Sequence, residues 1–153
     1  MPLSRLLSLV AALALVGCAS FKEGEKSKEA ELRQFSRVPG KVSLYVCRES
    51  ALWVARGVSS VVFVNNESIG TVKPNTFVHA ILDPGKHGVQ LRHDGLGGGS
   101  GGFITFEGKA DDVKFLWVGV TGKGFGVLTI DNFDAEAEAK ACIAEATYSV
   151  RTE

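Results

Sequence analysis

The chain has 153 residues, with 17 basic and 17 acidic side chains and therefore no formal net charge. This length favours a single folded domain, and 45% hydrophobic residues without net charge argue against disorder. The absence of a basic surplus argues against nucleic acid as a partner, because such a partner requires cations that neutralise phosphates.

The first residues have the layout of a secretory signal. Arg5 is the only charge before the apolar run from Leu6 to Val16. This run is too short for a membrane-spanning helix, which needs about 20 apolar residues. The sequence therefore predicts a signal peptide over residues 1–17.

The end of this segment, Leu15-Val16-Gly17-Cys18, resembles the bacterial lipobox. The resemblance implies that Cys18 becomes the mature N-terminus and carries acyl chains, such as palmitate, that anchor it to membrane lipid. By analogy with lipoprotein sorting, Ala19 implies the periplasmic face of the outer membrane in a bacterial cell envelope. The alternative is an ordinary signal peptide that ends in a cysteine by chance.

Residues 18–38 are interpreted as a lipid-anchored, charged tether. Nine of the residues from 19 to 38 are charged, and no apolar stripe is wide enough to demand packing. Glu29 and Arg33 have the spacing of a helical ion pair, which favours a short helix around 27–35. The turn-forming pair Pro39-Gly40 ends the segment.

A β domain is expected over residues 39–150. Short runs of alternating or Val-rich residues, separated by Gly, Pro, Asn and Asp, predict about eight strands. They lie at 41–48, 58–64, 68–72, 76–82, 87–92, 103–106, 113–120 and 125–130. The strands at 58–64 and 68–72 form a hairpin candidate around Asn65 and Asn66. The regular spacing is typical of a sandwich or barrel.

One helix is predicted over Asp134–Tyr148, which is rich in alanine and free of glycine and proline. Its small-sided face is expected to pack on a sheet, and consists of Ala135, Ala139, Cys142, Ile143 and Ala146. The strands at 76–82 and 113–120 are apolar on both faces, which predicts a second sheet on one face and this helix on the other. The expected fold is therefore a single, mainly β sandwich with a C-terminal helix.

Two segments, 35–48 and 70–89, resemble an uncharacterised domain of bacterial lipoproteins. The turn from Pro84 to His87 is also similar to PEGA-type domains of bacterial surface proteins. The resemblance covers about residues 35–148 and implies a transthyretin-like or immunoglobulin-like sandwich, without an assigned activity. Cys47 departs from the family, in which an aromatic residue is more frequent.

Cys47 and Cys142 leave two alternatives open. Export places them in an oxidising compartment, where a disulfide would staple the helix to the first strand. Alternatively, they are two buried thiols that act as small hydrophobes. Catalysis by either cysteine is disfavoured, because neither lies in a turn or near a basic cluster that would lower its pKa.

Two features are candidate partner contacts. The glycine-rich segment 94–102 lacks the Gly-Lys-Ser/Thr of a phosphate loop and is interpreted as a flexible hairpin loop, with Gly97, Gly98, Gly99 and Ser100 as contact residues. Trp53 is the better candidate for an exposed aromatic contact, since Trp117 lies in an all-apolar strand and is expected in the core.

The spacing of His79, His87 and His93 matches no metal motif, and we predict no metal site, cofactor or catalytic residue. The favoured hypothesis is a non-catalytic envelope lipoprotein that contacts an envelope protein or peptidoglycan. The alternatives are a periplasmic module that binds a small ligand or metal through residues 95–102 near His93, and an enzyme of unknown class.

Overall fold

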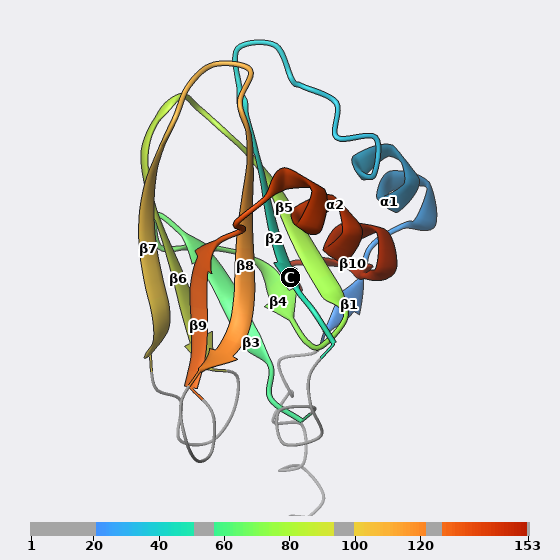
Figure 1. Cartoon of the computed structure of the whole chain (residues 1–153), viewed down its shortest axis with the longest axis vertical. Coiled ribbons are helices and arrows are strands. Elements are labelled where there is room, and N and C mark those ends of the chain that lie inside the picture. The colour runs from blue at the N-terminus through green and yellow to red at the C-terminus, as the bar shows by residue number, and fades with distance from the viewer. Residues whose placement is uncertain (1–20, 51–56, 94–99, 122–126, 153) are drawn as a thin grey trace, which may run out of the picture.

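The computed structural model describes residues 21–50, 57–93, 100–121 and 127–152 as two packed β-sheets with two helices on one side (Figure 1). One sheet has six strands in the order β1-β10-β5-β2-β8-β9, and the other has four in the order β4-β3-β6-β7. The elements are β1 (Lys22–Glu23), α1 (Lys26–Leu32), β2 (Val42–Arg48), β3 (Ser60–Val64), β4 (Glu67–Val72), β5 (Thr76–Leu82), β6 (Gly85–His93), β7 (Ser100–Gly108), β8 (Val113–Thr121), β9 (Val127–Asn132), α2 (Glu136–Glu145) and β10 (Thr147–Val150). The predicted β-sandwich with a C-terminal helix is confirmed.

Strand β2 lies at the centre of the six-stranded sheet and is buried on both faces. It pairs antiparallel with β5 and parallel with β8. Because side chains alternate along a strand, Leu44 and Val46 point to the inner face, toward the four-stranded sheet, while Tyr45 and Cys47 point to the outer face. Each face therefore builds its own hydrophobic core.

The outer core lies under the two helices. Ala139 and Ile143 of α2 are buried, as is Ala146 just after the helix. Ile143 and Ala146 belong to the same core cluster as Tyr45 and Phe77 of the sheet. These residues belong to the small-sided face that the sequence predicts. Ala135, which the prediction also placed on that face, is exposed at the start of the helix.

The interpretation of the whole segment 18–38 as a solvated tether is wrong for the residues from 22 onward. Strand β1 pairs with β10, and Leu32 of α1 is buried. The buried Glu29 carboxylate accepts a hydrogen bond from the backbone N–H of Tyr148 at 2.8 Å and pairs with Arg33 at 3.1 Å. The predicted ion pair and short helix are present, but they bind the segment to the domain.

Tyr45 forms a second link to α1. Burial raises the pKa of Tyr45 to about 12, so its hydroxyl stays protonated and donates to the Leu32 carbonyl at 2.9 Å. The Tyr45 ring also packs within 5.5 Å, between centroids, of both Phe35 and Phe115. A few apolar contacts therefore hold α1 where no wide apolar stripe exists in its sequence.

The predicted helix over 134–148 is too long at its C-terminal end. Helix α2 ends at Glu145, and Thr147–Val150 forms β10, which pairs parallel with β5. These residues form a strand instead of a further helical turn because the Tyr148 ring then packs in the aromatic core. Its centroid lies 5.3 Å from that of the Phe77 ring. Strands β1 and β10 are the two that the sequence analysis missed.

The last three residues of the glycine-rich segment, 100–102, belong to strand β7. Residues 94–99, which include Gly97, Gly98 and Gly99, lie outside the described residues, whereas Ser100 begins β7 and pairs with Arg92. A Cβ on Gly102 would come within 2.5 Å of the Ile130 backbone nitrogen. Glycine at this position therefore lets β7 approach β9 of the other sheet, so the loop interpretation is wrong for residues 100–102.

Cys47 and Cys142 form a disulfide, with their Cα atoms 6.4 Å apart. This decides between the two alternatives that the sequence left open. The bond joins the central strand β2 to α2 across 95 positions of sequence. It holds α2 on the outer face of the sheet.

Removal of this disulfide should destabilise the domain. Replacing both residues, Cys47→Ala with Cys142→Ala, releases a loop of 95 positions, for which the chain-entropy model gives a loss of about 4–5 kcal/mol. We expect a lower urea midpoint for the double variant than for the oxidised protein. Cys18→Ala is the control and should leave the midpoint unchanged; an unchanged midpoint in the double variant would contradict the stapling role.

Candidate functional site: an acidic cleft beside Trp117

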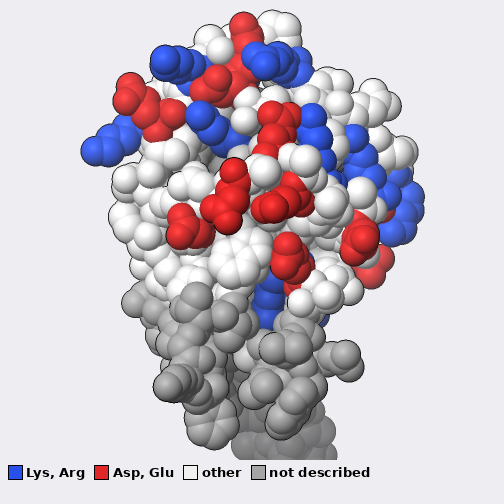
Figure 2. Space-filling model, viewed as in Figure 1, with Lys and Arg blue, Asp and Glu red and all other residues white. Residues whose placement is uncertain are grey.

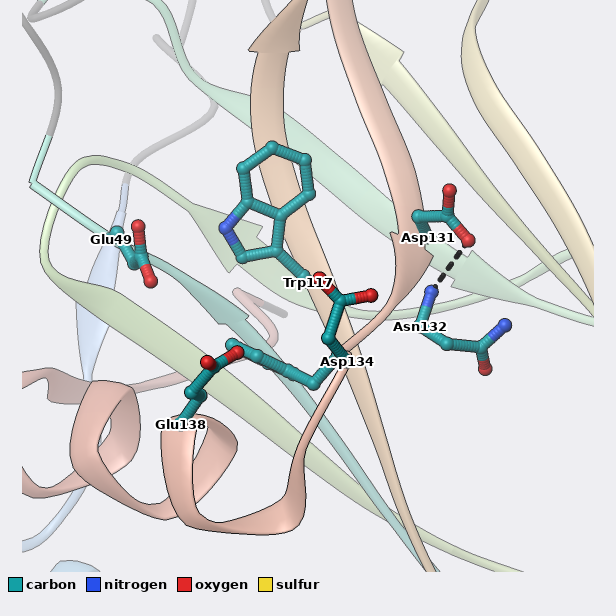
Figure 3. A pocket seen from close by; sticks show the side chains of 7 residues that line it. Glu49, Trp117, Asp131, Asn132, Asp134 and Glu138 are labelled. Carbon is teal, nitrogen blue, oxygen red and sulfur yellow. Dashed lines mark hydrogen bonds between the residues drawn. The ribbon is translucent and has the colours of Figure 1, made fainter.

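A cleft of about 350 Å³ opens where the outer sheet face meets the start of α2 (Figure 3). It is called the acidic cleft here. Its walls come from the ends of β2 and β9, the middle of β8, the connection after β9 and the first turns of α2. The lining residues are Glu49, Trp117, Asp131, Asn132, Phe133, Asp134 and Glu138.

Strand register brings these residues together. Trp117 of β8 lies beside Cys47 of β2 and opposite Asp131 of β9. Glu49 follows two positions after Cys47, so alternation directs it to the same outer face. The disulfide to Cys142 then fixes α2 nearby, with Glu138 one turn earlier on the helix.

Trp117 is held by the glycine two positions beyond it. A Cβ on Gly119 would overlap the indole ring, so the ring lies over the bare backbone of Gly119. The side chain is partly exposed, and in Figure 3 its ring nitrogen lies on the side toward Glu49. The expectation that Trp117 belongs to the core is therefore wrong: it forms a wall of the cleft.

The cleft is strongly negative. Four carboxylates come from Glu49, Asp131, Asp134 and Glu138, and no lysine or arginine is among the lining residues that the structure describes. None of these four takes part in an ion pair between residues that the structure describes. Figure 2 shows acidic side chains gathered on the face that carries α2.

Glu136, just outside the lining, behaves differently. The Lys140 ammonium lies 2.7 Å from its carboxylate and holds the pKa of Glu136 below its usual range, through a hydrogen bond and through its charge. This pair neutralises one charge on the exposed side of α2, whereas the described residues place no such cation beside the carboxylates of the cleft.

A second cleft of about 250 Å³ continues the acidic cleft along α2 and shares Glu49 and Glu138 with it. Glu145 and Cys142 line its far side. The two clefts together form an elongated acidic surface on both sides of Glu138. Such a surface suits an extended chain with several cations better than a single ion.

Carboxylates around an aromatic ring attract organic cations. An ammonium or guanidinium group gains charge attraction from the carboxylates and a cation–π contact from the indole face. In the described ranges, no three His, Cys, Asp or Glu side chains gather closely enough to hold a metal ion. The arrangement is therefore suited to lysine or arginine side chains, or to small amines.

The structure describes some of the site residues that the sequence predicts and not others. Cys18 and Trp53 lie outside the described residues, as do the three glycines of the contact loop. Among the predicted site residues that the structure describes, Cys47 and Cys142 are brought together. The acidic cleft itself was missed, although the carboxylates that follow β9 and the outward register of Trp117 are visible in the sequence.

Comparisons with models of protein families, with curated proteins and with solved structures found no match. The resemblance to a lipoprotein domain therefore rests on residues 35–48 and 70–89 alone.

Gly119→Ala should displace the Trp117 ring, because the new methyl group would occupy its place. Measured in a Trp53→Phe background, where Trp117 is the single tryptophan, the emission should shift to longer wavelength and acrylamide quenching should increase. Gly88→Ala, on the other sheet beside Phe103, is the matched control. If Gly119→Ala leaves emission and quenching unchanged, the ring does not lie over Gly119.

Proposed function

We propose that this protein is a lipid-anchored lipoprotein of the bacterial cell envelope and that its domain is a non-catalytic interaction module. Its acidic cleft receives lysine or arginine side chains of an envelope protein. The observation that carries the proposal is a cleft with four carboxylates around a partly exposed indole and no lysine or arginine among its described lining residues.

The proposed anchor is supported by the signal-like segment and the lipobox that ends in Cys18. Within the described residues, no helix is long and apolar enough to cross a membrane. Acyl chains on Cys18 would supply the membrane affinity instead, and two or more chains give stable attachment. Because β1 begins at Lys22, the folded domain would follow this anchor almost directly.

The proposed partner contact is supported by charge and shape together. An elongated acidic surface attracts a basic segment from a distance and orients it before contact. The Trp117 ring then offers a flat apolar surface, of the kind enriched at interaction sites, to the alkyl part or the charged end of a side chain.

Cys18→Ala should release the protein from membranes, because it removes the residue that carries the acyl chains. The measurement is the distribution between membrane and soluble fractions after cell lysis. Cys142→Ala is a matched cysteine variant and should stay in the membrane fraction. Retention of the Cys18→Ala protein in the membrane would contradict the anchor.

Asp134→Asn with Glu138→Gln should weaken binding of a lysine-rich probe peptide to the full lipoprotein in detergent micelles by about tenfold, since each exposed charge contributes modestly. Calorimetric titration at low salt measures the affinity, and added salt should weaken binding by the wild-type protein. The control variant, Glu23→Gln with Glu107→Gln, changes charge by the same amount away from the cleft. Equal affinities for the two variants would contradict the proposed site.

A further inference from the structure

A second cavity, of about 210 Å³, lies on the outer sheet face between α1 and the strands β2 and β5. It is called the α1 pocket here, and among the described residues it shares no lining residue with the acidic cleft. Leu32 and Val38 form its wall on the side of α1 and the following loop, and Ser43, His79 and Ile81 form its wall on the side of the sheet.

Ser43 has an unused hydroxyl in this wall. The residue is only 1% exposed, and its Oγ has no hydrogen-bond partner among the described residues. A buried hydroxyl without a partner is unfavourable, and native structures keep few of them. A ligand in the pocket that bonds to Ser43 would remove this penalty.

His79 supplies a second polar group, and it is uncharged. Burial lowers the pKa of His79 to about 4, and the nearby positive charge of Lys28 acts in the same direction while Glu31 opposes it. The ring centroid lies 4.5 Å from that of Tyr45, which fixes the imidazole against the aromatic core. A neutral imidazole carries one donor and one acceptor.

The charged groups at the pocket largely cancel. Lys28 and Glu31 both line it, and they pair with each other at 2.8 Å. The Tyr45 hydroxyl already donates to the Leu32 carbonyl. The uncharged polar side chains left for a ligand in the described lining are therefore Ser36, Ser43 and neutral His79, which favours an uncharged ligand.

The remaining surface is apolar and partly open. Ile81 is 45% exposed and is, with Phe103 on the other sheet, one of two large hydrophobic side chains exposed among the described residues. A cavity of about 150 Å³ is enough to bind benzene. A pocket of about 210 Å³ therefore accommodates one ring with a small polar substituent.

We propose that the α1 pocket binds an uncharged single-ring amphiphile of the phenol class. The ring packs against Ile81 and Val38, and the hydroxyl exchanges hydrogen bonds with Ser43 and His79. This site is independent of the acidic cleft, so the protein combines a surface for a cationic partner with a pocket for a small neutral ligand.

The test is titration of the full lipoprotein in micelles with phenol, followed through the NMR signal of the His79 ring. We expect a saturable shift in the wild-type protein. Ser43→Ala should weaken the affinity about fivefold, as expected for one lost hydrogen bond, and should keep or raise the melting temperature. Micelles take up phenol equally in every sample, so differences between variants report the site.

Ser149→Ala is the matched control, because Ser149 is the other buried serine whose hydroxyl is without a partner among the described residues, and it lies on β10 outside the α1 pocket. It should keep the wild-type phenol affinity. Ile81→Ser at the exposed rim should also weaken binding, whereas Phe103→Ser should not. A wild-type protein without a saturable shift, or Ser43→Ala and Ile81→Ser variants that bind as tightly as wild type, would overturn the proposal.

Discussion

The disulfide between Cys47 and Cys142 is the constraint on which the outer face of this protein depends. Strand β2 is buried on both sides, so its position is set by the two cores. The disulfide ties α2 to this fixed strand. The helix itself offers only a narrow face of small side chains for packing. The acidic cleft lies near this bond, because its lining residues include Glu49, two positions after Cys47, and Glu138, one turn before Cys142.

The second support of the outer face is α1. Its seven residues are too few to form a stable helix alone. Contacts with the folded sheet hold it instead: the Glu29 carboxylate bonds to the β10 backbone, and the Tyr45 hydroxyl bonds to the last residue of the helix. Arg33 adds a hydrogen bond to the Ala146 carbonyl at 2.8 Å and so links α1 to the end of α2. The α1 pocket exists because this short helix is held above the sheet.

The sequence predicts most strands of the sandwich because alternation and turn residues are local signals. The hairpin of β3 and β4 and the full extent of β5 follow from them. Strand β10 is not locally visible, since Thr147–Val150 continues an alanine-rich helix pattern and becomes a strand only by pairing with β5. The packing of α1 cannot be predicted from local sequence for a similar reason. Two apolar residues, Leu32 and Phe35, do not make an apolar stripe, and the residues they contact lie far along the chain.

The candidate site was harder to predict than the fold. Alternation placed Cys47 on the Tyr45 face, and helical spacing placed Cys142 on the buried face, but their pairing also required the helix to cover that particular sheet face. Trp117 was misplaced because an all-apolar strand suggests burial on both sides, whereas the first turns of α2 lie beside this position and leave the indole partly exposed. The cleft joins residues from four elements, and only the tertiary structure brings their carboxylates together.

The most direct test of the acidic surface is hydrogen exchange of the full lipoprotein with and without a lysine-rich peptide. The account predicts slower exchange at Trp117, at residues 131–134 and in the first turns of α2, with β3, β6 and β7 unchanged. Slower exchange confined to the four-stranded sheet, or no change anywhere, would contradict it.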